Sequence, residues 1–389
     1  MRKICIVAPF ITLPGEPGLN RFWTIAKILF ERYDVQRDPR RLCHFTKSQR
    51  SSVRRIENVN IVLLDEPGYT KNVSLKRYYS HRQLCRNFKE FLKQTTYFDL
   101  FYSAFPLMQT NLDLGEHCQT HRSKLIIDVQ DIWPDSITGP VPFLNKSPFK
   151  WLLRPLKDKA AAALNYTDAL VAVSHTYLHQ ANVKHLPASK TCCVYIGANS
   201  LFFSHDKDKA QFTAIYIGTM AGSYDLKTVV KASAGLKDIE IVFVGDGPDR
   251  VKLENFNRSI GGKVIFRKPV PYAELQRIMQ MSDIAINPIV KTSQGSVTNK
   301  LSDYFCAGLP IVSCQSSPEV RKLLNEGGGM CYEPGNTKDL ALALGEVARD
   351  HKKRKEMRTI NQKIAKKLFY RPESYKKIIE LVDRLLETK

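Results

Sequence analysis

The chain has 389 residues, of which 43% are hydrophobic and 25% are charged. These values are typical of globular proteins and exclude a disordered or collagenous chain, and the length favours two domains over one. The 59 Lys and Arg residues against 38 Asp and Glu residues give a net charge of +21, which indicates an anionic partner. No run of eighteen apolar residues occurs, so the sequence predicts no membrane-spanning helix.

The nine cysteines are scattered and include no C-x-x-C pair. This pattern argues against a zinc ribbon and is typical of a reducing compartment, where cysteine serves as a small apolar residue. The apolar run from Ile4 to Phe10 is short and has no cleavage site, so we do not interpret it as a signal peptide. His117 and His121 lie four residues apart without a third ligand, and we expect no metal.

Short apolar runs alternate with helical patterns along most of the chain, which is the rhythm of parallel α/β sheets. The predicted strands are 3–8, 59–64, 98–102, 124–128, 168–173, 191–195, 212–217, 239–244, 263–266, 283–287 and 310–313. The predicted helices are 18–31, 76–93, 107–121, 147–165, 175–183, 225–235, 248–257, 272–281, 298–307 and 317–325. The tail, 336–389, is predicted to be helical except for a break at Arg371-Pro372.

These elements predict two Rossmann-like doubly wound parallel-sheet domains facing a cleft, with ligands at the carboxyl ends of the strands. The apolar runs restart after Gly197-Ala198-Asn199, so we place the first domain at 1–198 and the second at 199–365. We expect the last segment, 366–389, to be a helix that packs back on the first domain.

The most informative segment is 283–312, in which a strand, a small-residue loop and a helix follow one another. The backbone of Val297, Thr298 and Asn299 opens the helix, and Lys300 lies in its first turn. A helix N-terminus with an early lysine is a natural anion site. Asp303, one turn further, can accept hydrogen bonds from sugar hydroxyls. The alternative is an ordinary loop followed by a solvated carboxylate.

Asp303, followed by Gly308-Leu309-Pro310, resembles the end of the E-x7-E region of family 4 glycosyltransferases. In that family the second acid holds the ribose of the nucleotide, and Asp303 falls on it, whereas the first acid is replaced here by Gly295. The run from Asn299 to Tyr304 is instead similar to the N-K-L-x-[ED]-Y loop of a bacterial surface-polysaccharide subgroup. Because the first acid is missing, Lys300 and the backbone of Val297 to Asn299 become the stronger candidates for binding the donor.

Three more segments resemble the same family. Gly218, Thr219 and Gly222 stand where the family has its diphosphate turn, although its usual arginine and lysine are absent. Gly245-Asp246-Gly247-Pro248 is similar to a strand-ending turn that we interpret as architecture, and 194–199 resembles the interdomain linker.

The first domain supplies candidates for the acceptor side. Gly15, Glu16, Gly18 and Arg21 form a glycine-rich loop and open a helix, where the arginine can reach a phosphate unless this is a plain connection. The block from Asp128 to Ser136 resembles the D-x-x-D-x-W-P-[ED]-S block of bacterial sugar transferases. Asp131 is our candidate for orienting the acceptor hydroxyl and Asp128 is the second choice, because a positioned carboxylate can draw the proton away.

Much of the positive charge lies in residues 35–95, which contain fourteen Lys or Arg residues and five Asp or Glu residues. The predicted helix 76–93 is basic, and Lys150, Trp151 and Arg154 combine cations with an aromatic ring. Such segments suit the surface of an anionic membrane, although a solvated helix face explains them equally well. No nucleic-acid recognition motif is present, so we expect no nucleic-acid partner.

The resemblance implies a metal-free, retaining glycosyltransferase of the GT-B type that uses a nucleotide diphosphate sugar, UDP-linked among the possibilities, and needs no cofactor. It also implies a lipid-linked glycan acceptor in surface polysaccharide synthesis, and a cytoplasmic enzyme at the inner face of the cell membrane. Two alternatives stay open: a sugar-nucleotide epimerase of the same fold, and a non-catalytic partner subunit, which the missing acid at Gly295 suggests.

Overall fold

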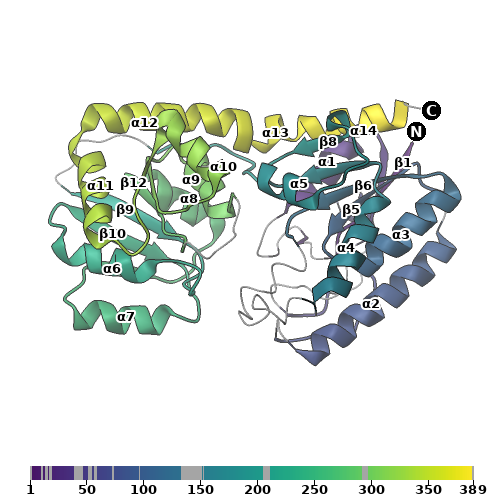
Figure 1. Cartoon of the computed structure of the whole chain (residues 1–389), viewed down its shortest axis with the longest axis horizontal. Coiled ribbons are helices and arrows are strands. Elements are labelled where there is room, and N and C mark those ends of the chain that lie inside the picture. Colours follow the sequence, from purple (N-terminus) through teal and green to yellow (C-terminus); the bar gives the residue numbers. More distant parts are fainter. Residues whose placement is uncertain are drawn as a thin grey trace. The chain divides into compact units, whose positions relative to one another are not determined.

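Figure 1 shows the computed structural model of the chain. It describes residues 2–9, 12–13, 16, 20–38, 47–50, 55–56, 59–71, 74–95, 97–132, 151, 153–204, 211–290 and 297–387. The chain divides into two compact units, of which the first is Met1–Val194 with Tyr375–Lys389 and the second is Tyr195–Ser374. The sequence prediction had instead ended the first domain at residue 198 and begun the C-terminal segment at residue 366.

The first unit is built on an eight-stranded sheet with the order β3-β4-β2-β1-β5-β6-β7-β8. Its strands are β1 Lys3–Val7, β2 Asp34–Asp38, β3 Arg55–Ile56, β4 Val59–Ile61, β5 Leu100–Phe105, β6 Lys124–Val129, β7 Ala169–Ala172 and β8 Thr191–Cys193. All neighbours are parallel except the β3–β4 pair. The central strands β1, β5, β6 and β7 read as nearly continuous apolar runs because both faces of the sheet are covered there.

Helices cover both faces of this sheet. They are α1 Arg21–Phe30, α2 Leu75–Gln94, α3 Met108–His121, α4 Arg154–Asn165, α5 His175–Ala181, the 3-10 turn η4 Ala188–Lys190, and α14 Lys376–Glu387. Ile4 and Ile6 of β1 pack with residues of α1 and α14, whereas Cys5 and Val7 pack with α2, α3 and α4. Alternate residues of one strand therefore contribute to two separate cores.

The second unit has a fully parallel six-stranded sheet with the order β11-β10-β9-β12-β13-β14. Its strands are β9 Phe212–Ile217, β10 Ile239–Val244, β11 Val264–Arg267, β12 Ile284–Asn287, β13 Ile311–Ser313 and β14 Gly329–Cys331. Its helices are α6 Leu226–Gly235, α7 Arg250–Ser259, α8 Tyr272–Gln280, α9 Asn299–Cys306, α10 Pro318–Leu323, η5 Leu324–Gly328, α11 Thr337–Arg349, α12 His351–Ile364, η6 Ala365–Phe369 and α13 Arg371–Ser374. The prediction of two doubly wound parallel-sheet domains is confirmed.

Three strands were not predicted, namely β2, β3 and β14. In β2, whose sequence is DVQRD, Val35 is the one apolar residue, and it is 1% exposed. The strand forms because its backbone pairs with β1 on one side and β4 on the other. The predicted break near Arg371-Pro372 corresponds to the extended Tyr370, after which α13 begins.

The second unit begins and ends with two segments that pair. Ala198 donates to the Phe369 carbonyl at 2.8 Å and accepts from the Arg371 amide at 3.0 Å. Gly197 has φ +61°, and a Cβ at this position would lie 2.2 Å from the Phe369 oxygen. This close approach explains the glycine in the predicted linker. None of the described helices is both long enough and apolar enough to cross a membrane.

Candidate functional site

The start of α9 presents a helix N-terminus in the second unit. Thr298 is the N-cap, and its side-chain oxygen accepts a hydrogen bond from the Leu301 amide at 3.3 Å. Val297 is buried before it, and Asn299 is the first helical residue. The Asn299 Oδ1 atom is buried and has no hydrogen-bond partner among the described residues. Amides that lack helical acceptors make such an end suitable for an anion.

Lys300 extends from the first turn of α9 to the end of β9. Its Nζ donates to the Tyr216 hydroxyl at 3.0 Å and lies 3.3 Å from the centroid of the Tyr224 ring. Burial lowers the pKa of Lys300 to about 7. A half-buried ammonium beside a helix N-terminus concentrates positive potential at this place.

Gly218 follows β9 and gives the lysine its room. Its φ is +107°, and a Cβ would lie 3.1 Å from Cδ and 3.3 Å from Nζ of Lys300. The Gly218 carbonyl is itself covered by Gly245, where a Cβ would come within 2.0 Å of the Gly218 oxygen. Thr219 contributes its carbonyl as an acceptor for the Tyr216 hydroxyl at 2.5 Å. At Gly222 the nearest such contact is 4.0 Å, so its surroundings leave room for a side chain.

Asp303 lies one turn after Lys300 and is half-buried. It accepts a hydrogen bond from the hydroxyl of Tyr272, the first residue of α8, at 2.7 Å. Burial raises the pKa of Asp303 to about 6, against the lowering effects of Tyr272 and Arg371. The carboxyl group therefore titrates closer to neutrality than an ordinary aspartate does.

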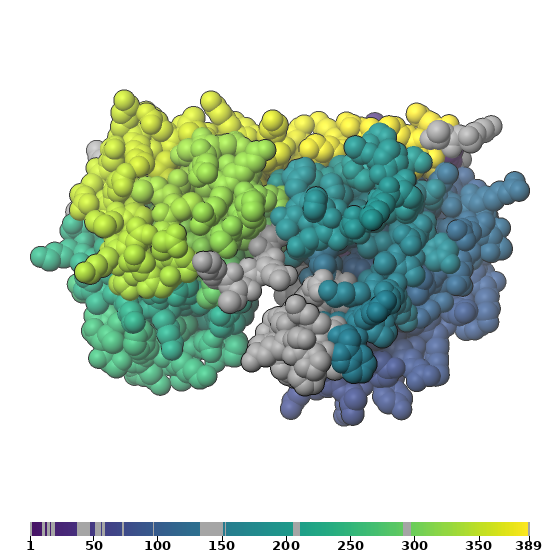
Figure 2. Space-filling model, viewed as in Figure 1, coloured from purple at the N-terminus to yellow at the C-terminus, as the bar shows by residue number. Residues whose placement is uncertain are grey.

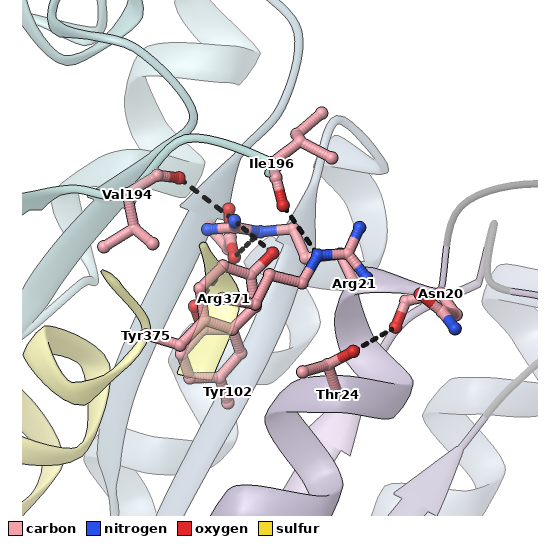
Figure 3. Close-up of polar contacts among 9 residues, drawn as sticks. Asn20, Arg21, Thr24, Tyr102, Val194, Ile196, Arg371 and Tyr375 are labelled. Atoms are coloured by element: carbon pink, nitrogen blue, oxygen red, sulfur yellow. Dashed lines mark hydrogen bonds and ion pairs between the residues drawn. The ribbon is translucent and has the colours of Figure 1, made fainter. Parts of the chain in front are cut away.

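Arg21 and Asp128 of the first unit lie together in the core. Arg21 Nε donates to Asp128 Oδ2 at 2.9 Å, and the two side chains are 2% and 0% exposed. The Tyr102 hydroxyl donates to the same oxygen at 2.7 Å, and Arg21 Nη1 donates to the Val194 carbonyl and the Tyr375 hydroxyl. Figure 3 shows Arg21 among these partners. The position differs from the expected one, because a buried, ion-paired arginine does not reach out to a phosphate.

Asp131 and Glu16 have local partners of their own. Asp131 is half-buried just after β6, and its Oδ1 accepts from the Ile132 amide at 2.9 Å. Glu16 accepts from Arg50 at 2.6 Å and from the Leu13 amide at 2.9 Å. Other residues named in the sequence analysis lie outside the described ones, namely Phe10, Gly15, Gly18, Ser136, Lys150 and Gly295.

The exposed face of α2 is basic and aromatic. Ser80, Leu84, Phe88 and Leu92 recur every four residues and face the core. The opposite face exposes Leu75 at 82%, Tyr78 at 63% and Tyr79 at 70%, and five cations lie exposed along it: Lys76, Arg82, Arg86, Lys89 and Lys93. Figure 2 shows side chains of α2, in slate blue, on the surface of the first unit. Trp151, 66% exposed, and the exposed Arg154 lie at the start of α4.

The sequence analysis missed three tyrosines: Tyr216, Tyr224 and Tyr272. Each follows or ends an apolar run beside a predicted turn, which is a weak signal, since most such rings belong to a core. Their contacts to Lys300 and Asp303 depend on chain segments up to 84 residues apart. Among the described residues, no three His, Cys, Asp or Glu side chains gather as metal ligands would.

Residues 198–364 match the family model described as "Glycosyl transferases group 1". No curated protein matches the sequence. The chain is similar in structure to sucrose-phosphate synthase from Thermosynechococcus elongatus, with a TM-score of 0.73, 13% identity and 100% of both chains covered. It is also similar to Anabaena HepE in complex with UDP and glucose (TM-score 0.65, 14% identity) and to WaaG, a glycosyltransferase involved in lipopolysaccharide biosynthesis (TM-score 0.65, 11% identity), again over 100% of both chains. The chain therefore has the GT-B fold, and the match to the glycosyl transferases group 1 model lies within its second unit.

Proposed function

We propose that the protein is a glycosyltransferase that takes a sugar from a nucleotide diphosphate sugar, with UDP as the nucleotide. The observation that carries the proposal is Lys300, which extends from the N-terminus of α9 to the Gly218 turn. This arrangement suits a diphosphate, whose charge a lysine and helix amides stabilise as it leaves. The match of residues 198–364 and the UDP and glucose in the HepE structure support the same donor class.

In this proposal each residue near α9 has its own part. Asp303 accepts the ribose hydroxyls in its ionised form, and Asn299 Oδ1 accepts a hydroxyl of the donor. The amides that follow the Thr298 cap face the phosphates. By its resemblance to family 4, transfer is retaining and needs neither a metal nor another cofactor.

We further propose Asp131 as the group that orients the acceptor hydroxyl. It follows the carboxyl end of a parallel strand, β6, where ligands bind in doubly wound sheets. Asp128 is less suited, because its charge is already committed to Arg21. The proposed acceptor is a lipid-linked glycan of surface polysaccharide synthesis, which the block from Asp128 to Ser136 and the likeness to WaaG support.

A lipid-linked acceptor requires access to a membrane surface. The exposed face of α2, with Trp151 and Arg154, supports peripheral binding to an anionic leaflet at the inner face of the cell membrane. Each cation near such a surface contributes about 1 kcal/mol to membrane binding, and tyrosine and tryptophan rings insert favourably into the membrane–water interface. No nucleic-acid partner is part of the proposal.

The purified chain, incubated with UDP-glucose and with UDP-linked alternatives, tests the proposal. Release of UDP that rises when a lipid-linked glycan is added is the expected result, and conversion of the sugar without any acceptor identifies an epimerase instead. Lys300→Met should abolish UDP release, whereas Lys231→Met, at an exposed position of α6 in the same unit, should not. A chain that neither binds nor converts any nucleotide sugar contradicts the proposal and favours a non-catalytic subunit.

A further inference from the structure

Two tyrosines hold the end of Lys300. Tyr216 receives its hydrogen bond at 3.0 Å, and the ammonium lies 4.7 Å from the Tyr216 ring centroid and 3.3 Å from that of Tyr224. Aromatic faces attract cations because the ring quadrupole is negative there. The Tyr216 proton is directed to the Thr219 carbonyl, so the oxygen of that hydroxyl remains an acceptor for the lysine.

Both rings are themselves fixed. Tyr216 is fully buried in β9 and packs edge-on against Phe243, with ring centroids 5.2 Å apart. Tyr224 contacts the Tyr216 ring at 5.8 Å, and its backbone forms a bridge with Ile289 beyond β12. The two tyrosines therefore form a rigid cradle that fixes the position of the Lys300 ammonium group.

No carboxylate among the described residues pairs with Lys300, and burial is the cause of its low pKa. Within the described part of the chain, the titratable groups that face it are the phenols of Tyr216 and Tyr224, whose pKa values burial raises, so both stay neutral. Behind them, the Tyr304 hydroxyl accepts from the Ile217 amide, and burial raises its pKa as well. Asp303, on the same helix, is bound to Tyr272 instead.

We propose that Tyr216 and Tyr224 are positioning residues for the donor. They hold Lys300 beside the Gly218 turn, so that the diphosphate supplies the counter-charge that the described residues do not, and Lys300 takes up a proton as the donor binds. This inference rests on the proposed function and adds to it a pH-dependent step and two residues with a defined role.

The sign of the pH dependence follows from the two states. The free lysine loses its proton as the pH rises through about 7, whereas the lysine beside a diphosphate must stay charged. Lys300 should therefore cause no change in donor affinity with pH below about pH 7. Above that value donor affinity should fall by up to about tenfold per pH unit.

The test is calorimetric titration with UDP-glucose in buffers of different ionisation enthalpy. UDP-glucose is preferable to UDP because it lacks the terminal phosphate group, which titrates near a pKa of about 6. We expect proton uptake on binding above about pH 7 in the natural chain, and none in Lys300→Met. Uridine, which has no phosphate, should show neither the uptake nor the pH dependence.

Tyr224→Leu and Tyr224→Phe are the matched pair. Leucine removes the ring face and should weaken UDP-glucose binding roughly tenfold, whereas phenylalanine keeps the face and should stay within about twofold. In a Lys300→Met background, Tyr224→Leu should have no further effect on binding. Equal binding by the leucine and phenylalanine variants, or an equal loss of uridine and UDP-glucose binding, would overturn the inference.

Failure of the proposed function itself has a different signature. If the natural chain binds no UDP-glucose, the cradle is tested without ligand, by the pH dependence of Lys300 modification with an amine reagent, followed by mass spectrometry. A half-maximal rate near pH 7, altered by Tyr224→Leu, supports the cradle. A midpoint at the ordinary lysine value of about 10.4, unchanged by Tyr224→Leu, refutes it.

Discussion

Lys300 destabilises the fold that holds it. Burial lowers its pKa from 10.5 to about 7, so between these values the folded chain binds fewer protons here than the unfolded chain does. This destabilisation is therefore absent above the unfolded pKa, grows as the pH falls below that value, and reaches its full size below about pH 7. Because the buried Lys300 lowers the stability of the fold, we assign it to ligand binding rather than to folding.

Lys300→Met should accordingly raise the melting temperature of the unliganded chain at pH 7 while it weakens UDP-glucose binding without removing it. For a unit of this size, each kcal/mol gained raises the melting temperature by about 2–4 °C. The gain should be smaller at about pH 9, because the free-energy cost of keeping Lys300 unprotonated in the folded chain shrinks as the pH approaches the unfolded pKa. Scanning calorimetry measures it, with Lys231→Met as the neutral control. A lower melting temperature in Lys300→Met would show that packing of the lysine stem outweighs the buried charge.

Asp128 and Asp131 are three residues apart and should respond differently to the same change. Asp128→Asn leaves Arg21 buried without its ion-pair partner and should cost about 3–5 kcal/mol of stability. Asp131→Asn, at a half-buried position, should leave the melting temperature nearly unchanged and lower turnover by roughly 10²–10⁴-fold, with donor affinity intact.

Thermal denaturation and steady-state kinetics of the two variants separate these roles. Normal turnover in Asp131→Asn would remove it from the chemistry. A loss of turnover together with stability would make it a structural residue.

At the scale of elements, α2 shows how one helix serves two environments. Its buried residues recur at positions 80, 84, 88 and 92, and the three apolar ones at 84, 88 and 92 join a core, while its other face leaves cations and two tyrosines in solvent. A helix needs only the first stripe to pack. The exposed tyrosines on the second face have no role in that packing, which is why we assign them to a surface partner.

Replacing Arg82 and Arg86 with glutamine should therefore weaken binding to vesicles that contain anionic lipid, by roughly tenfold or more. Vesicle sedimentation at low and high salt measures this, and salt should weaken binding of the natural chain in the same way. Lys352→Gln with Lys355→Gln, which removes the same charge from α12 of the second unit, is the control. Equal loss in both double variants would indicate net charge alone, and no loss in either would contradict the membrane proposal.

At the scale of the whole molecule, the first unit is built from both ends of the chain. Ile378, Leu381, Val382 and Leu385 of α14 lie in one core with β1 and α1. The Tyr375 hydroxyl accepts a hydrogen bond from Arg21 at 3.1 Å, so the returning segment is also tied to the buried ion pair. The first unit is thus incomplete without residues 375–387.

Leu381→Ala should lower the stability of the first unit by about 2–5 kcal/mol, because it removes buried methyl groups and leaves a cavity. Glu380→Ala, at the neighbouring exposed position, should change it little. Hydrogen exchange resolved by mass spectrometry should show faster exchange in β1 and α1 of the leucine variant, with the second unit unaffected. Faster exchange spread evenly over both units would mean that they do not unfold separately.

Much of the fold was predictable from local patterns. The strands β1, β5, β6, β9 and β10 are apolar runs, and a run buried on both faces carries its own signal. The position of Lys300 in the first turn of a helix was also predictable, because a capping threonine and a loop of small residues precede it. Such signals depend only on neighbours along the chain.

Other features were decided by the tertiary structure. The charged β2 is a strand because β1 and β4 offer it backbone partners, which no local pattern encodes. Arg21 meets Asp128 across 107 residues, and Lys300 meets Tyr216 across 84. Whether an arginine faces a ligand or a buried carboxylate, and whether a lysine is charged, depends on burial and on distant partners. The sequence by itself therefore determined most of the elements, the sheet type and the candidate donor loop. Packing decided the remaining strands and the state and partners of the charged residues.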